Sequence, residues 1–290
     1  MSNTSVSAST GGPRIAVRKT YKLYIGGAFP RSESGRSYVV TDHKGGFLAN
    51  AALASRKDAR DAVTAARKAF AGWSGATAYN RGQVLYRVAE LLEGRRAQFV
   101  AEVRAAEGLS ARLAEAAVDE AIDRWVWYAG WSDKIAQVRG AANPVAGPYF
   151  NFTVPEPTGV VATIAPDTPP LEGIVSRVLP AIVSGNTVVA VAESSPLAAI
   201  ELAEAIATSD MPGGTVNMLT GRVSELAPIL AGHMDVNAID LTGADGATAE
   251  LERLAAGNVK RIVRGTADGQ SLWEIEPMLE MKTIWHPIGR

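Results

Sequence analysis

The chain has 290 residues, of which 47% are hydrophobic and 20% are charged. This balance is typical of a globular protein with one or two domains. The net charge of −1 excludes a strong electrostatic attraction to nucleic acid or to an anionic membrane surface. The sequence contains no cysteine, which excludes disulfides, thiolate metal sites and a cysteine nucleophile within these residues and fits a cytoplasmic location.

The first part of the chain is expected to be mainly helical. Residues 1–20 are rich in Ser, Thr, Gly and Ala and lack the apolar run of a signal peptide, so we expect a disordered tail. Residues 21–38 alternate short apolar pieces with turn residues, which is typical of short strands. Ser55 predicts a capping box at the start of a helix, and Asn80 is expected to cap the next one. Apolar residues at helical spacing then recur, so residues 21–140 are predicted to form a helical N-terminal part.

Strands and helices alternate in the second half of the chain. Five apolar runs typical of strands are separated by amphipathic helical stretches; they lie at residues 160–165, 186–192, 215–219, 236–241 and 259–263. Strands joined by helices of this length predict an α/β fold with a doubly wound, Rossmann-like parallel sheet over residues 159–265. Residues 266–277 form a polar linker. Residues 278–290 form a last strand, and because no helix follows it, this strand is not expected to continue the same sheet.

Few chemical motifs can be found in the sequence. It has no G-x-G-x-x-G, Walker A or G-x-S-x-G pattern. His43, His233 and His286 are far apart and lack metal-ligand spacing, so no metal site is predicted. A group of aromatic residues on one helix could stack on a ligand, but its members cover different faces, which favours packing in a core or an interface. This group consists of Trp125, Trp127, Tyr128 and Trp131.

Six groups of residues, in chain order, resemble the motifs of the aldehyde dehydrogenase superfamily. They are Leu23–Gly27 with Gly35–Arg36, Tyr128–Trp131 with Asp133–Lys134, Glu156–Val161, Pro180–Ala181 with Ser184–Val189, Met211–Gly221, and Leu241–Gly243. Together they cover residues 21 to about 263. The resemblance implies a chemistry in which a cysteine attacks an aldehyde, hydride passes to NAD(P), and a thioester is hydrolysed.

The resemblance also implies an oligomerisation arm. Residues 141–158 resemble the segment that pairs subunits in the family, and residues 278–290 resemble the family's last strand. The residues expected to form the pairing surface are Tyr149, Phe150, Phe152, Val154, Met281, Thr283 and Trp285. An isolated arm would expose strand edges that favour aggregation, so we expect a partner to cover it by strand addition.

Several positions that hold the cofactor in the family are altered. The vestigial contacts implied by the resemblance are Pro166, Thr168, Glu193, Gly221 and Gly243. Thr168 stands where the family has an oxyanion-stabilising Asn, and the ribose-binding motif that ends at Glu193 is one residue short and lacks its Lys. Ala244 replaces a Ser near the pyrophosphate, and no Glu in residues 263–266 matches the general base. Each lost contact costs about 1–3 kcal/mol, so NAD(P) binding is possible but weakened, and no cofactor is expected.

The departures from the family predict the function. The cysteine and the separate domain that carries it have no counterpart between the sheet and residue 278, so no catalytic residue is predicted. The resemblance therefore implies a pseudoenzyme, similar to the degenerate second half of double-domain aldehyde dehydrogenases, that pairs with a full-length aldehyde dehydrogenase paralogue and stabilises or localises it. Two alternatives stay open: an NAD(P)-dependent oxidoreductase with non-cysteine chemistry, and a self-associating nucleotide sensor. Neither nucleic acid nor a membrane is expected as a partner.

Overall fold

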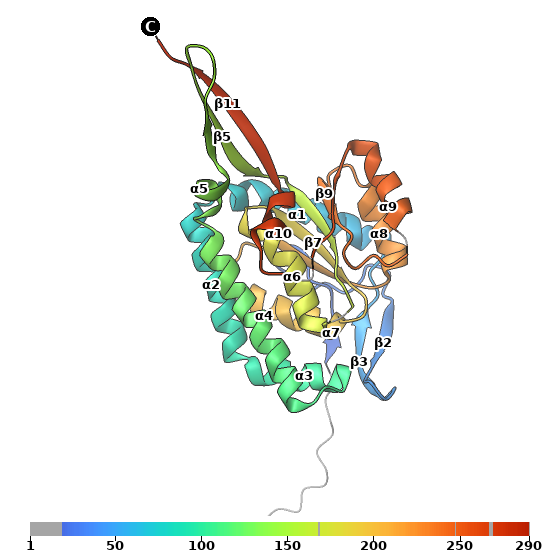
Figure 1. Cartoon of the computed structure of the whole chain (residues 1–290). Helices are drawn as coiled ribbons and strands as arrows, with labels where there is room; N and C mark the ends of the chain where they lie inside the picture. The colour runs from blue at the N-terminus through green and yellow to red at the C-terminus, as the bar shows by residue number, and fades with distance from the viewer. Residues whose placement is uncertain (1–18, 168, 247, 267–268, 290) are drawn as a thin grey trace, which may run out of the picture.

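A computed structural model of the chain describes residues 19–167, 169–246, 248–266 and 269–289 (Figure 1). Almost all of the predicted N-terminal tail and one predicted site residue, Thr168, lie outside these residues. Within the described ranges, no helix combines the length and the apolar character needed to cross a lipid bilayer.

A five-stranded parallel sheet lies at the centre of the body, in the order β10-β9-β6-β7-β8. Its strands are β6 (Val160–Ile164), β7 (Thr187–Ala192), β8 (Val216–Thr220), β9 (Ala238–Asp240) and β10 (Arg261–Val263). Val188 and Ala190 of β7 point into one hydrophobic core and Val189 and Val191 into another, because successive side chains of a strand point to opposite faces. A sheet buried on both faces is typical of doubly wound folds, and the predicted α/β fold is confirmed.

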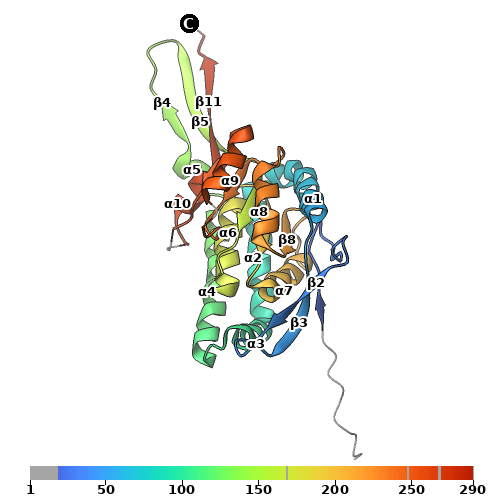
Figure 2. The same cartoon turned by 90° about the vertical axis from the view of Figure 1, so that its right-hand side faces the viewer.

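Helices cover both faces of this sheet (Figures 1 and 2). One face is covered by α1 (Arg56–Gly75), α8 (Val223–Gly232) and α9 (Thr248–Ala255). The other face is covered by α6 (Pro170–Val183) and α7 (Pro196–Ala207), and an outer layer of α2 (Ala78–Gly94), α3 (Arg96–Glu107) and α4 (Ala111–Trp131) packs on these two helices.

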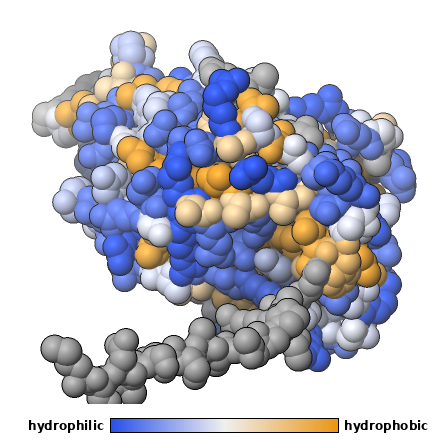
Figure 3. Space-filling model, turned by 90° about the horizontal axis from the view of Figure 1, so that it is seen from below, coloured by the Kyte–Doolittle hydropathy of each residue, from blue (hydrophilic) through white to orange (hydrophobic). Residues whose placement is uncertain are grey.

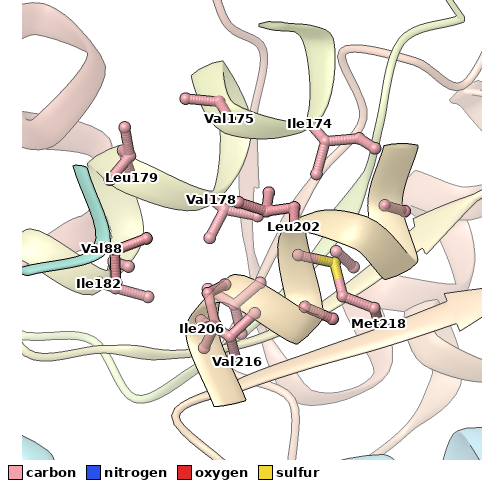
Figure 4. Close-up of a cluster of buried hydrophobic side chains, with 14 of the residues drawn as sticks. Val88, Ile174, Val175, Val178, Leu179, Ile182, Leu202, Ile206, Val216 and Met218 are labelled. Atoms are coloured by element: carbon pink, nitrogen blue, oxygen red, sulfur yellow. The ribbon is translucent and has the colours of Figure 1, made fainter. Parts of the chain in front are cut away.

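The larger core lies between the sheet and this outer layer of helices. Figure 4 shows part of it, where Val178 of α6 and Leu202 of α7 lie close to Val216 and Met218 of β8. Trp125 and Tyr128 of α4 are fully buried in the same core, so the predicted packing role of these aromatic residues is confirmed. At the end of the molecule opposite the arm, apolar side chains form separate patches between hydrophilic ones (Figure 3).

The N-terminal part begins with a small sheet ordered β1-β3-β2. Its strands are β1 (Thr20–Tyr21), β2 (Ser37–Thr41) and β3 (Phe47–Ala52). The predicted capping box of α1 is confirmed, since the Ser55 hydroxyl accepts the backbone N–H of Asp58 and the Asp58 carboxylate accepts that of Ser55. The predicted cap of α2 is wrong. Thr77 caps this helix, because its hydroxyl accepts the N–H of Asn80 and so satisfies a donor of the first turn.

The arm projects from the body as a three-stranded antiparallel sheet, ordered β11-β5-β4 (Figures 1 and 2). Helix α5 (Ile135–Arg139) leads into β4 (Ala141–Asn143), which pairs with β5 (Tyr149–Pro157), and β5 pairs with β11 (Leu279–Pro287). The prediction that the last strand leaves the central sheet is confirmed. The linker before it carries the short helix α10 (Leu272–Ile275) and a 3-10 turn, Glu276–Met278, which its polar composition did not predict.

Candidate functional site

The candidate ligand crevice lies at the carboxyl ends of β6 and β9, where the strand order reverses. Pro166 follows β6 and Gly243 follows β9. The Gly243 amide donates to the Ile164 carbonyl at 3.1 Å, and a Cβ at position 243 would lie 2.4 Å from the Ala165 carbonyl. Only glycine fits there, and it lets the two loops pack directly on each other.

A second pair of predicted residues lies at the ends of β7 and β8. Glu193 follows β7, and its carboxylate accepts the backbone N–H of Val223 at 2.6 Å and Nη1 of Arg222 at 2.9 Å. Val223 is the first residue of α8, so the carboxylate stabilises a helix N-terminus. Gly221 immediately precedes Arg222. The structure therefore brings Pro166 close to Gly243, and Glu193 close to Gly221, and the carboxylate expected at a ribose already has two protein partners.

A hollow of about 340 Å³ opens beside this crevice, between α6 and the linker. Pro166 and Thr242 lie on its wall together with Gly265 and Thr266 of the linker and Arg177 of α6. A Cβ at position 265 would lie 1.5 Å from Nη1 of Arg177. The guanidinium therefore occupies the space of a side chain at position 265, within the segment 263–266 to which the resemblance assigns the family's general-base motif.

Arg177 belongs to a buried ionic cluster. Its Nη1 lies 2.7 Å from Oε2 of Glu274 in α10 and 3.6 Å from Oδ2 of Asp240 in β9, and all three side chains are at most 2% exposed. Burial raises the pKa of Asp240 against the opposing effects of Arg177 and Thr242. Burial also acts to raise the pKa of Glu274, but hydrogen bonds from Thr266 and the charge of Arg177 outweigh it and lower this pKa. The charged form of Glu274 is therefore favoured beside Arg177, whereas burial disfavours the charged form of Asp240.

A second ionic cluster joins α4 to α6, and a hydrogen bond beside it joins α4 to the linker. Nη2 of Arg124 lies 2.8 Å from Oε1 of Glu172 in α6 and 2.8 Å from Oε1 of Glu120. Burial raises the pKa of Glu172, and the charge of Arg124 opposes this shift. The Tyr128 hydroxyl donates to the Gly269 carbonyl at 2.8 Å. Sequence reasoning missed the pairs Arg177–Glu274 and Arg124–Glu172 because their partners are far apart in the chain and no local motif marks them.

The β5–β11 register gives the arm one apolar face. Phe152 lies opposite Ile284, and Phe150 lies opposite His286; residues directly opposite in an antiparallel pair share a face. The two Phe rings are 5.4 Å apart, and Phe150 and Ile284 are 49% and 38% exposed. We call Phe150, Phe152, Val154 and Ile284 the apolar arm face. In the single chain, Phe152 and Val154 of this face are half-buried.

The opposite face of the arm is polar at its centre. Asn143 donates to Asn151 and Thr153, and the hydroxyls of Thr153 and Thr283 are 2.9 Å apart. Other predicted pairing residues flank this polar row; they are Tyr149, whose ring is 5.9 Å from that of Trp285, and Met281. The residues predicted for pairing therefore divide between the two faces. The apolar arm face also carries His286 opposite Phe150 and Lys282 opposite Val154.

A doubly wound parallel sheet with a crevice at its carboxyl edge is the framework of the dinucleotide-binding oxidoreductase folds. Residues 29–271 match the Aldehyde dehydrogenase family, and the chain belongs to this family. It is 32% identical over 263 residues to the mouse cytosolic 10-formyltetrahydrofolate dehydrogenase, a match that covers 86% of this chain and 28% of that protein.

Two solved structures illustrate how far the similarity extends. HpcC from Thermus thermophilus has a TM-score of 0.80 and 31% identity, over 85% of this chain and 48% of that one. The NAD+ complex of aldehyde dehydrogenase from Bacillus cereus has a TM-score of 0.80 and 26% identity, over 84% of this chain and 50% of that one. The chain thus spans about half the length, or less, of these proteins.

Proposed function

We propose that this chain is a pseudoenzyme that pairs with a full-length aldehyde dehydrogenase in a hetero-oligomer and stabilises or localises it in the cytoplasm. In this proposal, segments 141–158 and 278–290 form the pairing arm. The helical part (21–140) and the sheet (159–265) form the scaffold that carries the arm, and segment 266–277 fastens the arm's last strand to the scaffold.

The lack of independent catalysis is supported by the residues beside the crevice. The 290 residues include no cysteine for thioester chemistry. Gly265 has no side chain to act as a base, and Arg177 fills the space beside it. Glu274, in the part of the chain between β10 and β11, forms a buried ion pair with Arg177 of α6.

Weakened binding of NAD(P) is part of the same proposal. Both oxygens of Glu193 are engaged by Arg222 and by the start of α8, so a ribose hydroxyl would have to displace one of these partners. Ala244 is 2% exposed and provides no hydroxyl for a phosphate. Each missing or displaced hydrogen bond weakens binding further.

The observation that carries the proposed pairing is the apolar arm face. The three-stranded sheet that carries Phe150, Phe152, Val154 and Ile284 projects away from the body (Figure 2). In the single chain Phe150 and Ile284 are exposed, and Phe152 and Val154 are half-buried. Among the described residues, β11 also has no strand on its outer edge, which is a template for strand addition. A partner that covers the apolar arm face and adds a strand to the edge of β11 would bury the apolar side chains and pair the free backbone groups of that edge.

Affinity purification tests this proposal. A tagged chain is co-expressed with a full-length aldehyde dehydrogenase from the same genome, and we expect the enzyme to be recovered with it in a fixed ratio. Phe152→Ser should abolish the recovery. Leu113→Ser is the control, because Leu113 is an exposed apolar residue (48%) that lies on α4, away from the arm. Recovery of only a homo-oligomer, or equal recovery with both variants, would contradict the proposal.

A further inference from the structure

Two charged side chains, Arg177 and Glu172, line the hollow between α6 and the linker, and each has one terminal atom without a hydrogen bond among the described residues. Arg177 is 2% exposed and bonds Ser176 through Nε and Glu274 through Nη1; among the described residues, its Nη2 has no hydrogen-bond partner. Glu172 is 8% exposed and meets Arg124 through Oε1, while its Oε2 has no partner among the same residues. Both residues line the hollow. It therefore offers one free hydrogen-bond donor, Nη2 of Arg177, and one free acceptor, Oε2 of Glu172.

The charges around the hollow are nearly balanced. Arg177 is compensated by Glu274, and Glu172 is compensated by Arg124. A ligand with only one charge would bring an uncompensated charge into a largely buried site, which is unfavourable. A ligand with one positive and one negative group would add no net charge, and each of its groups would find an opposite partner on the wall.

The size and the remaining walls of the hollow restrict the ligand further. About 340 Å³ is at the lower end of the range of pockets that hold small molecules. Pro166 and Pro169 provide an apolar wall for a few methylene groups, and Ser176, Thr242 and Thr266 also line the hollow. These features fit a short, flexible and polar molecule better than a nucleotide.

We propose that this hollow binds a small zwitterion of the amino-acid class, with its carboxylate on Nη2 of Arg177 and its ammonium group on Oε2 of Glu172. A guanidinium is suited to a carboxylate because its planar N–H groups match the carboxylate geometry. The site is built from α6 and the linker and does not include the arm, so it stands whether or not the chain pairs with another protein.

Calorimetry on the unmodified full chain tests this site with defined probes. Glycine, β-alanine, γ-aminobutyrate and 5-aminovalerate differ by one methylene each, and we expect at least one of them to bind in a 1:1 ratio. The N-acetyl derivative and the methyl ester of the best probe each lack one charge, and each should bind at least about tenfold more weakly, a difference of 1.4 kcal/mol. Absence of saturable binding by all four probes up to about 10 mM, or equal affinity for the blocked derivatives, would overturn the proposal.

Two variants locate the site within the structure. Glu172→Gln removes the acceptor charge, and Arg177→Lys keeps a cation beside Glu274 but removes the free Nη2; each should weaken binding of the best probe at least about tenfold. Glu115→Gln and Arg112→Lys, which change exposed residues of α4, should leave it unchanged. Circular dichroism shows whether each variant is folded. Unchanged affinity in both folded site variants would refute the assignment, and if a variant does not fold, the comparison of blocked and unblocked probes decides.

Discussion

Replacing Glu274 by alanine leaves the guanidinium of Arg177 buried without its ionised partner. Both side chains are 2% exposed, and the two charged atoms are 2.7 Å apart. Removal of one member of such a buried pair costs about 3–5 kcal/mol, because the remaining charge stays desolvated. A domain of ordinary stability has about 5–15 kcal/mol in total. We therefore expect Glu274→Ala to lower the free energy of unfolding by about 3–5 kcal/mol.

Urea unfolding followed by tryptophan fluorescence measures this change. The control is Asp61→Ala, which breaks the exposed i,i+4 pair with Lys57 and should cost about 0.3–0.5 kcal/mol. The double change Arg177→Met with Glu274→Leu should recover most of the loss, since apolar residues can replace a buried pair and burial already raises the pKa of Asp240. If Glu274→Ala costs no more than the surface control, the linker is not fastened by this pair and the reasoning is wrong.

Three further predictions concern the arm, the crevice and a buried acid. Phe152→Ser should raise the solubility of the chain expressed alone, measured as the soluble fraction after centrifugation, whereas Leu113→Ser should not. Ala244→Ser restores a hydroxyl near the crevice and should tighten NAD+ binding about 2- to 10-fold, measured by fluorescence quenching. Weaker binding would contradict the placement of residue 244 near the pyrophosphate. Burial and then the nearby charge of Glu201 raise the pKa of Glu102 from 4.5 to about 8. Over this interval the folded state keeps a proton that the unfolded state has released, so stability should fall as the pH rises from about 4.5 to about 8, and Glu102→Gln should flatten the profile measured by urea unfolding.

Much of the fold could be predicted from the sequence because its signals are local. Alternating strands and helices predicted the doubly wound sheet, and Ser55 predicted the capping box that the structure contains. The cap of α2 was misplaced at Asn80 because both Thr77 and Asn80 are good capping residues, and only the hydrogen bond decides between them. Helix α10 was missed because four residues carry too little periodicity to be recognised.

The candidate site was less predictable, because its contacts join distant parts of the chain. Pro166 and Gly243 were identified only through the family resemblance, and their close packing depends on the order of strands in the sheet. The pairing of Arg177 with Glu274 links residues on two different elements, α6 and α10. Neither residue stands in a motif. Whether the predicted cofactor and pairing residues have these roles stays a prediction until the measurements above are made.

The central claim is that this chain acts as part of a complex with an active aldehyde dehydrogenase. Native mass spectrometry of the two co-expressed proteins tests it most directly. A species containing both chains in a fixed ratio, which the Phe152→Ser variant does not form, is the result expected from the apolar arm face. Separate masses for the two proteins at concentrations where the enzyme itself is oligomeric would contradict the claim.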